Sequence, residues 1–298
     1  MIRPRLGSKK GLAIANGINT ALADVDPYWM AVAGIDEAIR NIVCIGGNPD
    51  RTAILDNFCW GSCEDPQTMG ALVRACQACY DAAIAYGTPF ISGKDSLNNE
   101  FALDPADARR LADRIRLHNN RIRIPETLLI SAIAIIDDVS TCATMDAKPV
   151  ADSLFYFVGL QAAAWPEADI RQAAALHRKV AELIRGGAVL AAHDCGDEGV
   201  LATLAEMAFA GKCGVEATFS DPAPLAPIPC GYVLQVAADQ AKKATALASQ
   251  LAGVRVVPIG RVTAGDKLAW RESDAKGAER FEVDLDKLAD AWRSPLNW

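Results

Sequence analysis

The stretch over residues 89–101, PFISGKDSLNNEF, holds the residue types with the most evident chemistry in the chain. Gly93 lets backbone amides approach phosphate oxygens, Lys94 supplies a positive charge for them, and Asp95 offers a hard oxygen ligand to Mg²⁺. We predict that a short strand leads here into a polar loop that binds phosphate and metal. The alternative is a surface turn capped by Asp95 or Ser96, since the stretch is not a Walker A motif.

Glu37 and Asn41 form a second candidate site. They lie four residues apart in an otherwise apolar segment, so in a helix their side chains share one face. A carboxylate beside an amide oxygen suits Mg²⁺. The alternative is a partly exposed polar stripe, which Asp36 and Arg40 extend as an ion pair at positions i and i+4.

Residues 193–199, HDCGDEG, join an apolar segment to the start of a helix and form a third candidate. Ligands collect at the carboxyl ends of strands in α/β folds, and helix N-termini attract anions. The alternative is a simple turn with Asp197 as the N-cap and Gly199 as the turn residue. That alternative leaves His193 and Asp194 without a role.

Asp56 is a fourth candidate, in the sequence DNF directly after a predicted strand over residues 52–55. A carboxylate there can receive a ribose hydroxyl, an amine or a metal. The alternative is an Asx-turn, and composition does not decide between them.

The nine cysteines lie mostly in apolar segments, and we interpret them as reduced. Cys59, Cys63, Cys76 and Cys79 together imitate the spacing of a four-thiolate zinc site. The favoured alternative is packing, because Cys76 and Cys79 fall among alanines in a predicted helix, where small apolar residues allow close contact. Nucleophilic hydrolysis is not predicted, since there is no evident Ser/His/Asp pattern.

Length and composition indicate a compact protein. The 298 residues predict two domains, and a net charge of -7 without a cationic block argues against a nucleic-acid partner. No uninterrupted apolar run reaches the roughly 18 to 20 residues that span a bilayer, and the basic first ten residues lack a signal-peptide core. We therefore expect a cytoplasmic protein that is neither secreted nor bound to a membrane.

Apolar periodicity and turn residues predict the elements that must position these groups. In the first half we expect helices over residues 26–46, 69–86 and 104–117, and strands over residues 52–55, 89–92 and 127–136. The last of these strands is a near-continuous apolar run, which is typical of a strand buried on both faces. The pattern breaks at Pro149, so we place a domain boundary within residues 148–152.

Strands and helices alternate in the second half, which indicates an α+β or α/β domain. We expect helices over residues 169–185, 200–210 and 240–251, and strands over residues 154–160, 189–192, 215–219, 232–236 and 255–262.

Four motifs give the chain a resemblance to the synthetase subunits of phosphoribosylformylglycinamidine synthases. DPYWMAVAGIDEAIRN, AILDNFCW, PFISGKDSLNNEF and AHDCGDEGVLATLAEMAFAGKCG occur in the order found in that family. Its superfamily includes aminoimidazole ribonucleotide synthetase and thiamine-phosphate kinase. The resemblance implies a two-domain aminoimidazole ribonucleotide synthetase-like architecture, with an α/β domain over residues 1–150 and an α+β domain over residues 151–298. The first domain would contribute to a β-barrel shared with a second half or subunit.

The resemblance also implies a reaction, the ATP-dependent amidation of formylglycinamide ribonucleotide to formylglycinamidine ribonucleotide in purine biosynthesis. The substrate's amide oxygen would attack the γ-phosphate of ATP with Mg²⁺ present, and ammonia would displace the phosphate. By this resemblance the chain is a C-terminal half that is inactive alone. Its partners would be an N-terminal half carrying the catalytic histidine and a glutaminase that supplies ammonia.

Individual positions match the family's motifs. Asp56 and Gly93 match contacts to ATP, and Ser96 matches a contact to the substrate. Lys94 stands where short members have a Mg²⁺-binding Asn. These residues would complete an active site formed mainly by the other half.

A further set of positions matches an auxiliary nucleotide site. Glu37, Asn41 and Asp194 match Mg²⁺ ligands for a structural ADP. Two residues of its phosphate loop depart from the family, because Gly196 stands where Ser is usual and Glu198 where Gly is usual. An added carboxylate repels a nucleotide's phosphates unless a metal intervenes.

Two alternatives to an enzyme half follow from the same motifs. One is a non-catalytic scaffold half that binds Mg-nucleotide at Glu37, Asn41 and Asp194. The other is an ATP-using relative that acts as a homodimer through the shared barrel.

Overall fold

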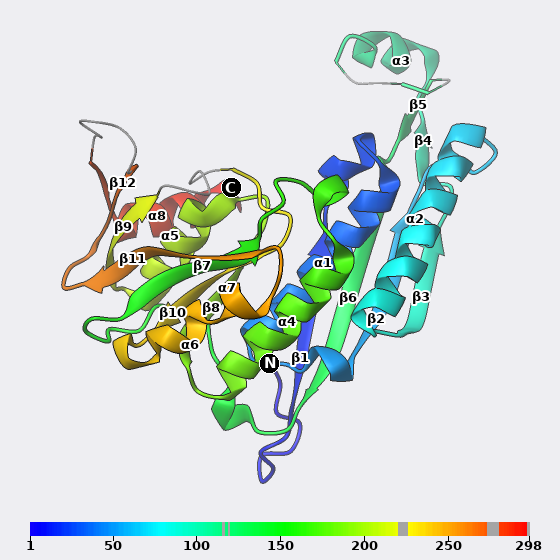
Figure 1. Ribbon diagram of the computed structural model, residues 1–298. Helices are drawn as coiled ribbons and strands as arrows, with labels where there is room; N and C mark the ends of the chain where they lie inside the picture. The colour runs from blue at the N-terminus through cyan, green and yellow to red at the C-terminus, as the bar shows by residue number, and fades with distance from the viewer. Residues whose placement is uncertain (115–116, 119, 220–225, 273–279, 297–298) are drawn as a thin grey trace.

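Two sheets of different size organise the molecule. The computed structural model spans residues 1–298 and describes all of them except 115–116, 119, 220–225, 273–279 and 297–298. Figure 1 shows the sheets side by side, with helices α1 (Pro27–Cys44) and α4 (Ile170–Arg185) between them. Within the described residues, no helix has the length and apolarity that crossing a bilayer requires.

The first unit is a four-stranded sheet with helices on one face. Its elements are β1 (Gly11–Ile18), α1, β2 (Thr52–Cys59), α2 (Pro66–Tyr86), β3 (Phe90–Ser96) and β6 (Thr127–Ile136). The strand order is β1-β6-β2-β3, in which only β2 and β3 run parallel. Both long helices start with a capping aspartate and a proline, which satisfies early amide groups and fixes φ for the first turn.

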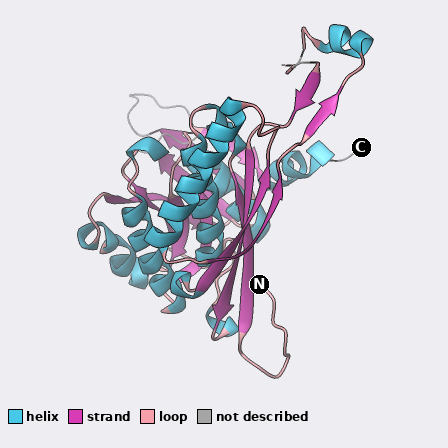
Figure 2. Ribbon diagram, turned by 90° about the vertical axis from the view of Figure 1, so that its right-hand side faces the viewer, coloured by secondary structure: helices cyan, strands magenta, loops and turns pink. Residues whose placement is uncertain are grey.

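A small arm projects from this unit. It consists of the two-stranded sheet of β4 (Glu100–Ala102) and β5 (Arg121–Arg123), with α3 (Pro105–Leu111) at its tip. Figures 1 and 2 show the arm standing away from both sheets. The helix predicted over residues 104–117 is therefore too long, because α3 ends at Leu111 and residues 115–116 lie outside the described part.

The second unit is a seven-stranded sheet covered on both faces. Its strands, in spatial order, are β13 (Phe281–Asp284), β12 (Lys267–Glu272), β9 (Gly214–Phe219), β11 (Val254–Thr263), β7 (Leu154–Leu160), β10 (Gly231–Val236) and β8 (Val189–Cys195). Its helices are α4, α5 (Gly199–Gly211), α6 (Ala241–Thr245), α7 (Leu247–Gln250) and α8 (Leu285–Arg293). The single helix predicted over residues 240–251 is wrong, since the segment forms the two short helices α6 and α7.

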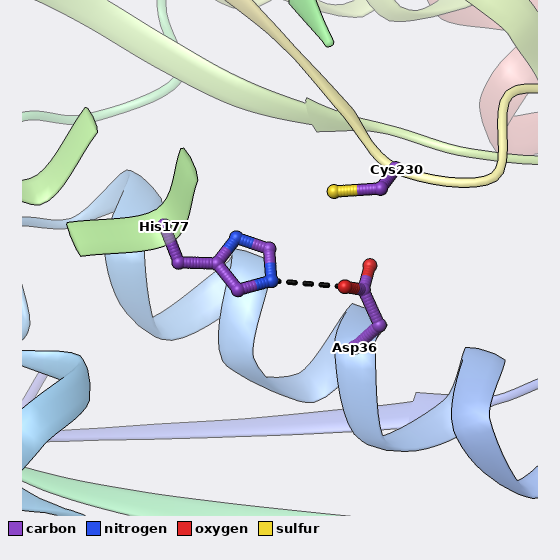
Figure 3. Close-up of side chains that lie close together, drawn as sticks. All are labelled: Asp36, His177 and Cys230. Atoms are coloured by element: carbon purple, nitrogen blue, oxygen red, sulfur yellow. Dashed lines mark hydrogen bonds and ion pairs between the residues drawn. The ribbon is translucent and has the colours of Figure 1, made fainter. Parts of the chain in front are cut away.

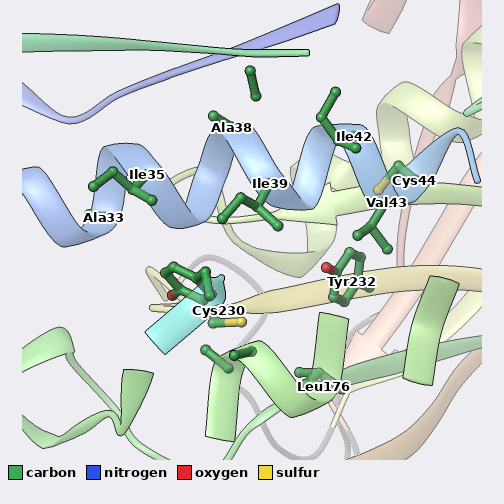
Figure 4. Close-up of a cluster of buried hydrophobic side chains, with 14 of the residues drawn as sticks. Ala33, Ile35, Ala38, Ile39, Ile42, Val43, Cys44, Leu176, Cys230 and Tyr232 are labelled. Atoms are coloured by element: carbon green, nitrogen blue, oxygen red, sulfur yellow. The ribbon is translucent and has the colours of Figure 1, made fainter. Parts of the chain in front are cut away.

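Helix α1 belongs to the cores of both units. Ile35, Ile39 and Ile42 are fully buried, and Figure 4 shows α1 lying against Tyr232 and Cys230 of the second unit. Full burial of each isoleucine side chain contributes about 1.5–3 kcal/mol relative to exposure. The two units are thus held together by one continuous apolar core.

Strand β6 differs from its prediction on one point. Its residues alternate between buried and partly exposed along the strand, and Ile135 is 40% exposed. The expected strand is confirmed, but burial on both faces is wrong, because the helices of the described residues cover only one face of the four-stranded sheet. The described residues form an open sheet there and not a closed barrel.

Candidate functional site

Asp56 and residues 93–96 come together on two neighbouring strands. β2 and β3 pair in parallel, with Asp56 opposite Gly93 and Cys59 opposite Ser96. The loop predicted for residues 93–96, its turn alternative and the Asx-turn alternative for Asp56 are all wrong, since these residues lie within strands. β3 is an edge strand whose side chains are largely exposed, so no apolar alternation marks it in the sequence. Its backbone ladder with β2 makes it a strand.

Alternation along the strands divides these residues between two faces of the sheet. Asp56 lines the face toward α2, together with Gly93 directly opposite it and Asp95 two register positions farther along. Lys94 and Ser96 occupy the opposite face, which no helix within the described residues covers. A ligand that contacts both sets must therefore reach around the edge of the sheet at β3.

Asp56 lies in a groove between α2 and the edge of the sheet. The groove has a volume of about 470 Å³, and Phe58, Tyr80 and Phe90 are among its lining residues. Burial raises the pKa of Asp56, and the nearby charge of Asp95 acts in the same direction, while a hydrogen bond from the Lys94 amide opposes them. A β-carbon at Gly93 would lie 2.3 Å from Asp56 Oδ1, so the carboxylate needs glycine at that position.

The uncovered face of the sheet presents Lys94 and Ser96 among apolar side chains. The Lys94 ammonium donates a hydrogen bond to Ser96 Oγ. On the same face, Ile14 is 50% and Ile18 is 46% exposed. This surface combines a cation and a hydroxyl with apolar groups that lack cover in the described structure.

Glu37 and Asn41 project from α1 toward β1. Glu37 Oε2 accepts a hydrogen bond of 2.8 Å from the Ile18 amide, and Asn41 Nδ2 donates one of 3.2 Å to the Glu37 carbonyl. Burial raises the pKa of Glu37, and the charges of Asp194 and Asp197 add to the rise. Glu37 is thus a partly buried carboxylate near two others, an arrangement that a cation would stabilise.

Asp194 is more firmly held than the other two predicted ligands. It is 8% exposed at the end of β8, with Oδ1 3.2 Å from His193 Nδ1 and Oδ2 3.8 Å from Arg40 Nε. Burial alone would raise the pKa of Asp194, but the hydrogen bond from His193 and the charge of Arg40 outweigh it and lower the pKa. Two cationic side chains therefore already offset its charge.

Gly196 opens the turn that leads into α5, and the chain's own Glu198 binds it. Glu198 Oε1 accepts hydrogen bonds of 3.1 Å from the Gly196 amide and 3.1 Å from Thr203 Oγ1. An anion arriving at this turn would meet a carboxylate that already uses the glycine amide. Asp197 points elsewhere and accepts a hydrogen bond of 2.7 Å from Asn19 Nδ2.

The residue types of the Glu37 site suit Mg²⁺, because the metal prefers carboxylate and amide oxygens. Their present arrangement is not a closed cage. Among the described residues, the only trio of His, Cys, Asp or Glu side chains whose ligand atoms lie within 4.8 Å of one another is Asp36, His177 and Cys230. The predicted zinc spacing of Cys59, Cys63, Cys76 and Cys79 does not produce such a group, and these cysteines are free thiols.

A buried polar cluster lies next to this site, and the sequence indicated only one pair within it. Asp36 and Arg40 form the expected ion pair, but they are 0% and 4% exposed, so they do not extend the partly exposed stripe of Glu37 and Asn41. Asp36 Oδ1 also accepts a hydrogen bond of 2.7 Å from Tyr86 Oη and lies 2.9 Å from His177 Nε2 (Figure 3). The signal available in the sequence was the pair itself, placed among apolar residues on α1.

The cluster joins the two units by hydrogen bonds. His177 of α4 contacts Tyr232 Oη through Nδ1 at 2.6 Å, so a chain of polar contacts runs from α2 through α1 and α4 to β10. Burial raises the pKa of Asp36, but the charges of Arg40 and His177 and hydrogen bonds outweigh it and lower the pKa.

Arg40 also opposes a metal ion at Asp36, His177 and Cys230, because a further cation beside a buried guanidinium is repelled.

Two family models match the chain once its parts are compared with known proteins. The N-terminal domain of AIR synthase related proteins matches residues 3–106, and their C-terminal domain matches residues 153–271. The chain is 27% identical over 318 aligned residues to phosphoribosylformylglycinamidine synthase subunit PurL from Deinococcus radiodurans, covering 97% of this chain and 40% of that protein. PurL from Rhodopseudomonas palustris strain BisA53 is 30% identical over 240 residues, covering 74% and 29%. The chain thus spans less than half the length of these relatives.

Solved structures share the fold. Thermotoga maritima PurL complexed with ATP superposes with a TM-score of 0.70 at 15% identity, covering 94% of this chain and 44% of that one. Thiamine-monophosphate kinase from Stenotrophomonas maltophilia K279a gives a TM-score of 0.60 at 13% identity, with coverage of 90% and 87%. The two-domain α/β plus α+β architecture expected from the motifs is confirmed.

Proposed function

Because the chain belongs to the family of AIR synthase related proteins, we propose that it forms part of an ATP-dependent enzyme that converts formylglycinamide ribonucleotide to formylglycinamidine ribonucleotide. The activity is a carbon-nitrogen ligation in purine biosynthesis. The sequence relatives named above are PurL subunits of that synthase, and the chain corresponds to less than half of their length. The remaining parts of the site would come from another half.

The observation that carries the proposal is the pairing of β2 with β3. It sets Asp56 against Gly93 on one face and places Lys94 and Ser96 on the other, around one sheet edge. We assign nucleotide contacts to Asp56, Gly93 and Lys94, and a substrate contact to Ser96. Asp95 is two register positions from Asp56, on the same face, and is the ligand through which this edge would hold Mg²⁺.

The chemistry at this edge is positioning and charge stabilisation. When the substrate's amide oxygen attacks the γ-phosphorus, the bond to ADP breaks and negative charge develops on the phosphoryl oxygens. The Lys94 ammonium offsets that charge, and the Ser96 hydroxyl orients the substrate. Ammonia then attacks the imidate carbon and phosphate leaves. We propose that a separate glutaminase supplies the ammonia, and that the reaction takes place in the cytoplasm.

The uncovered face of the four-stranded sheet supports the need for a partner. Ile14, Ile18 and Ile135 lie exposed on that face, at 50%, 46% and 40%. A second sheet of the same kind would bury them and close a shared barrel around Lys94 and Ser96. We propose that the partner is the N-terminal half of the same synthetase.

Reconstitution tests the proposal. The chain is combined with that N-terminal half as a separate polypeptide, with ammonium as the nitrogen source, and ADP release that depends on formylglycinamide ribonucleotide is measured. We expect Asp56→Asn and Ser96→Ala each to reduce turnover at least about tenfold, the loss of one oriented polar contact. The matched controls Asp113→Asn and Ser249→Ala lie on exposed surface and should leave turnover unchanged. Unchanged turnover in both site variants would contradict the assignment.

A second candidate function is a scaffold that binds Mg-ADP at Glu37, Asn41 and Asp194. The raised pKa of Glu37, caused by burial and by neighbouring carboxylates, favours a cation there. The Glu198 carboxylate at the Gly196 amide opposes phosphate binding in the adjoining turn. Calorimetry with Mg-ADP separates the favourable effect of Glu37 on the cation from the unfavourable effect of Glu198 on the phosphates. The scaffold requires binding that Glu37→Ala abolishes and Glu198→Ala strengthens, and it fails if none of the three proteins binds.

A third candidate is a homodimeric ATP-using enzyme. The likeness to thiamine-monophosphate kinase favours it, because that chain has about the same extent as this one. ATP turnover by the purified chain alone, lost in Ile14→Asp through disruption of the shared barrel, is the outcome that would establish it. An inactive pure chain that gains activity only with the N-terminal half excludes it.

A further inference from the structure

The outward side of α2 carries a row of exposed apolar residues, and part of this row also borders the groove beside Asp56. Met69, Val73, Tyr80 and Ile84 are 43%, 50%, 69% and 64% exposed, and the exposed Cys76 lies between them. We call these five residues the α2 seam. Figure 1 shows α2 on the outside of the first unit. The buried residues of the helix, such as Ala75, Ala78 and Ala82, face the core.

The spacing of the seam is that of a helix-pairing surface. The intervals from Met69 are four, three, four and four residues, so all but the last follow the alternation of four and three in a coiled-coil contact. A helix of 21 residues is roughly 31 Å long, enough for several layers of contact with another helix. Isolated exposed apolar residues are ordinary, but a continuous row along one helix indicates an interaction site.

The seam is also symmetric about its own midpoint. Met69 and Ile84 lie equally far in sequence from the centre between Cys76 and Gln77, and so do Val73 and Tyr80. In an antiparallel pair of two identical helices, the small Val73 would therefore meet the large Tyr80 of the other copy. Met69 would meet Ile84, and the two Cys76 side chains would approach each other at the two-fold axis. A large group opposite a small one is what close helix packing needs.

Charge permits this pairing. The α2 residues that flank the seam are Gly70, Leu72, Gln77 and Cys79, none of which carries a charge. The charged residues farther round the helix have partners within the chain, since Arg74 pairs with Asp26 and Asp81 accepts a hydrogen bond of 2.8 Å from Tyr28 Oη. In the antiparallel pair the flanking residues of one copy lie near those of the other, so the absence of flanking charges removes the like-charge repulsion that would oppose pairing.

We propose that the α2 seam is a self-association surface, on which two copies of this chain pair through antiparallel α2 helices. Five partly exposed side chains supply roughly half of the about 800 Å² per partner that stable dimers bury, so the dimer is weak and depends on concentration. The surface is distinct from the open sheet face, because it lies on the helix-covered side of the sheet. The proposal does not rest on the proposed activity.

Sedimentation velocity of the full chain from low to high micromolar concentration tests the pairing. We expect a monomer that shifts to a dimer, and we expect Tyr80→Asp to remain monomeric throughout. Phe101→Asp is the matched control, since Phe101 is 66% exposed on the arm and its charged variant should still dimerise. Tyr80 projects to solvent, and circular dichroism will verify that its variant is folded.

Cross-linking places the contact at the symmetry axis. A short bismaleimide should join two chains through Cys76, so the linked dimer disappears in Cys76→Ser and persists in Cys63→Ser. A chain that stays monomeric at all concentrations overturns the proposal. A dimer that Tyr80→Asp leaves intact also overturns the proposal. A dimer that Ile14→Asp dissociates overturns it as well, because that result would assign self-association to the open sheet face.

Discussion

Asp36 and Glu37 are adjacent on α1, yet they occupy opposite kinds of environment. Asp36 is fully buried, and Arg40, Tyr86 and His177 bind both of its oxygens. Glu37 has one backbone hydrogen bond from Ile18 and two acidic neighbours, Asp194 and Asp197. The pKa of Asp36 is lowered in spite of burial, because cations and donors outweigh it, whereas burial raises the pKa of Glu37.

The difference separates a structural charge from one that is available to a ligand. A buried carboxylate whose partners are complete holds elements together, and its cluster connects helices of the first unit to α4 and β10. A carboxylate with a raised pKa beside other carboxylates gains from a cation. One residue step along a helix turns a side chain by about 100°, which is enough to move it from the core between the units to the candidate site.

Removing Asp36 should give the largest effect. Asp36→Ala leaves Arg40 as a buried cation without its main partner, and we expect a loss of about 3–5 kcal/mol in the free energy of unfolding. Chemical denaturation measures it. The control Asp50→Ala breaks the exposed pair with Arg178 and should cost at most about 1 kcal/mol. Equal costs for the two variants would show that the cluster is not structural.

Gly17→Ala tests the packing that holds Glu37 in place. A β-carbon at Gly17 would lie 2.0 Å from the Gly34 carbonyl oxygen and 2.6 Å from the Ala38 amide nitrogen, so β1 must shift away from α1. We expect a loss of about 1–3 kcal/mol in stability, typical of overpacking. Gly7→Ala, which meets nothing within 4 Å, serves as the control in the same denaturation experiment. If Gly17→Ala left the free energy of unfolding unchanged, β1 would be free to move.

The free energy of unfolding should decline at alkaline pH because of His193, which forms an ion pair with Asp194. Burial lowers the pKa of His193, but Asp194 and Glu206 outweigh it and raise the pKa from 6.5 to about 10. The stabilising charge is therefore fully present below pH 6.5 and is lost as pH rises toward about 10. Unfolding free energies across this range should fall in the native chain and fall less in His193→Gln. Parallel curves would contradict the assignment.

Glu37→Gln should produce the smallest change, and in the opposite direction. Because the folded pKa of Glu37 is raised above 4.5, mainly by burial, the folded state holds the proton more strongly and loses stability as pH increases through that range. The variant should then be slightly more stable than the native chain at neutral pH and not below pH 4.5. Thermal unfolding at both pH values measures this. If Mg²⁺ binds here, it should stabilise the native chain and not the variant.

Much of the fold could be predicted from the sequence. The apolar spacing of α1, α2 and α4 and their capping residues mark these helices within a few residues of their observed bounds. The apolar strands β6, β7 and β10 were equally evident. β3 beyond Ser92 was not, because an exposed edge strand of polar residues carries no periodic signal and depends on its partner β2.

The candidate site divides in the same way. Motifs in the sequence identified Glu37, Asp56, Gly93 and Asp194 as residues to examine, and the chain belongs to the AIR synthase related proteins, the superfamily of the enzymes that these motifs resemble. Local sequence could not show that Lys94 and Ser96 face away from Asp56, since it predicted a loop where strand alternation applies.

The sequence by itself determined the elements whose patterns are local, together with the residue types able to bind phosphate and metal. The tertiary structure alone decided which charges are neutralised. Asp36 and Glu37 are neighbours in the chain, but His177 is 141 residues from Asp36 in sequence, and contact with it depends on how α4 packs against α1. Burial and pairing arise from contacts between distant segments, so the two carboxylates acquire different roles only when both units have packed together.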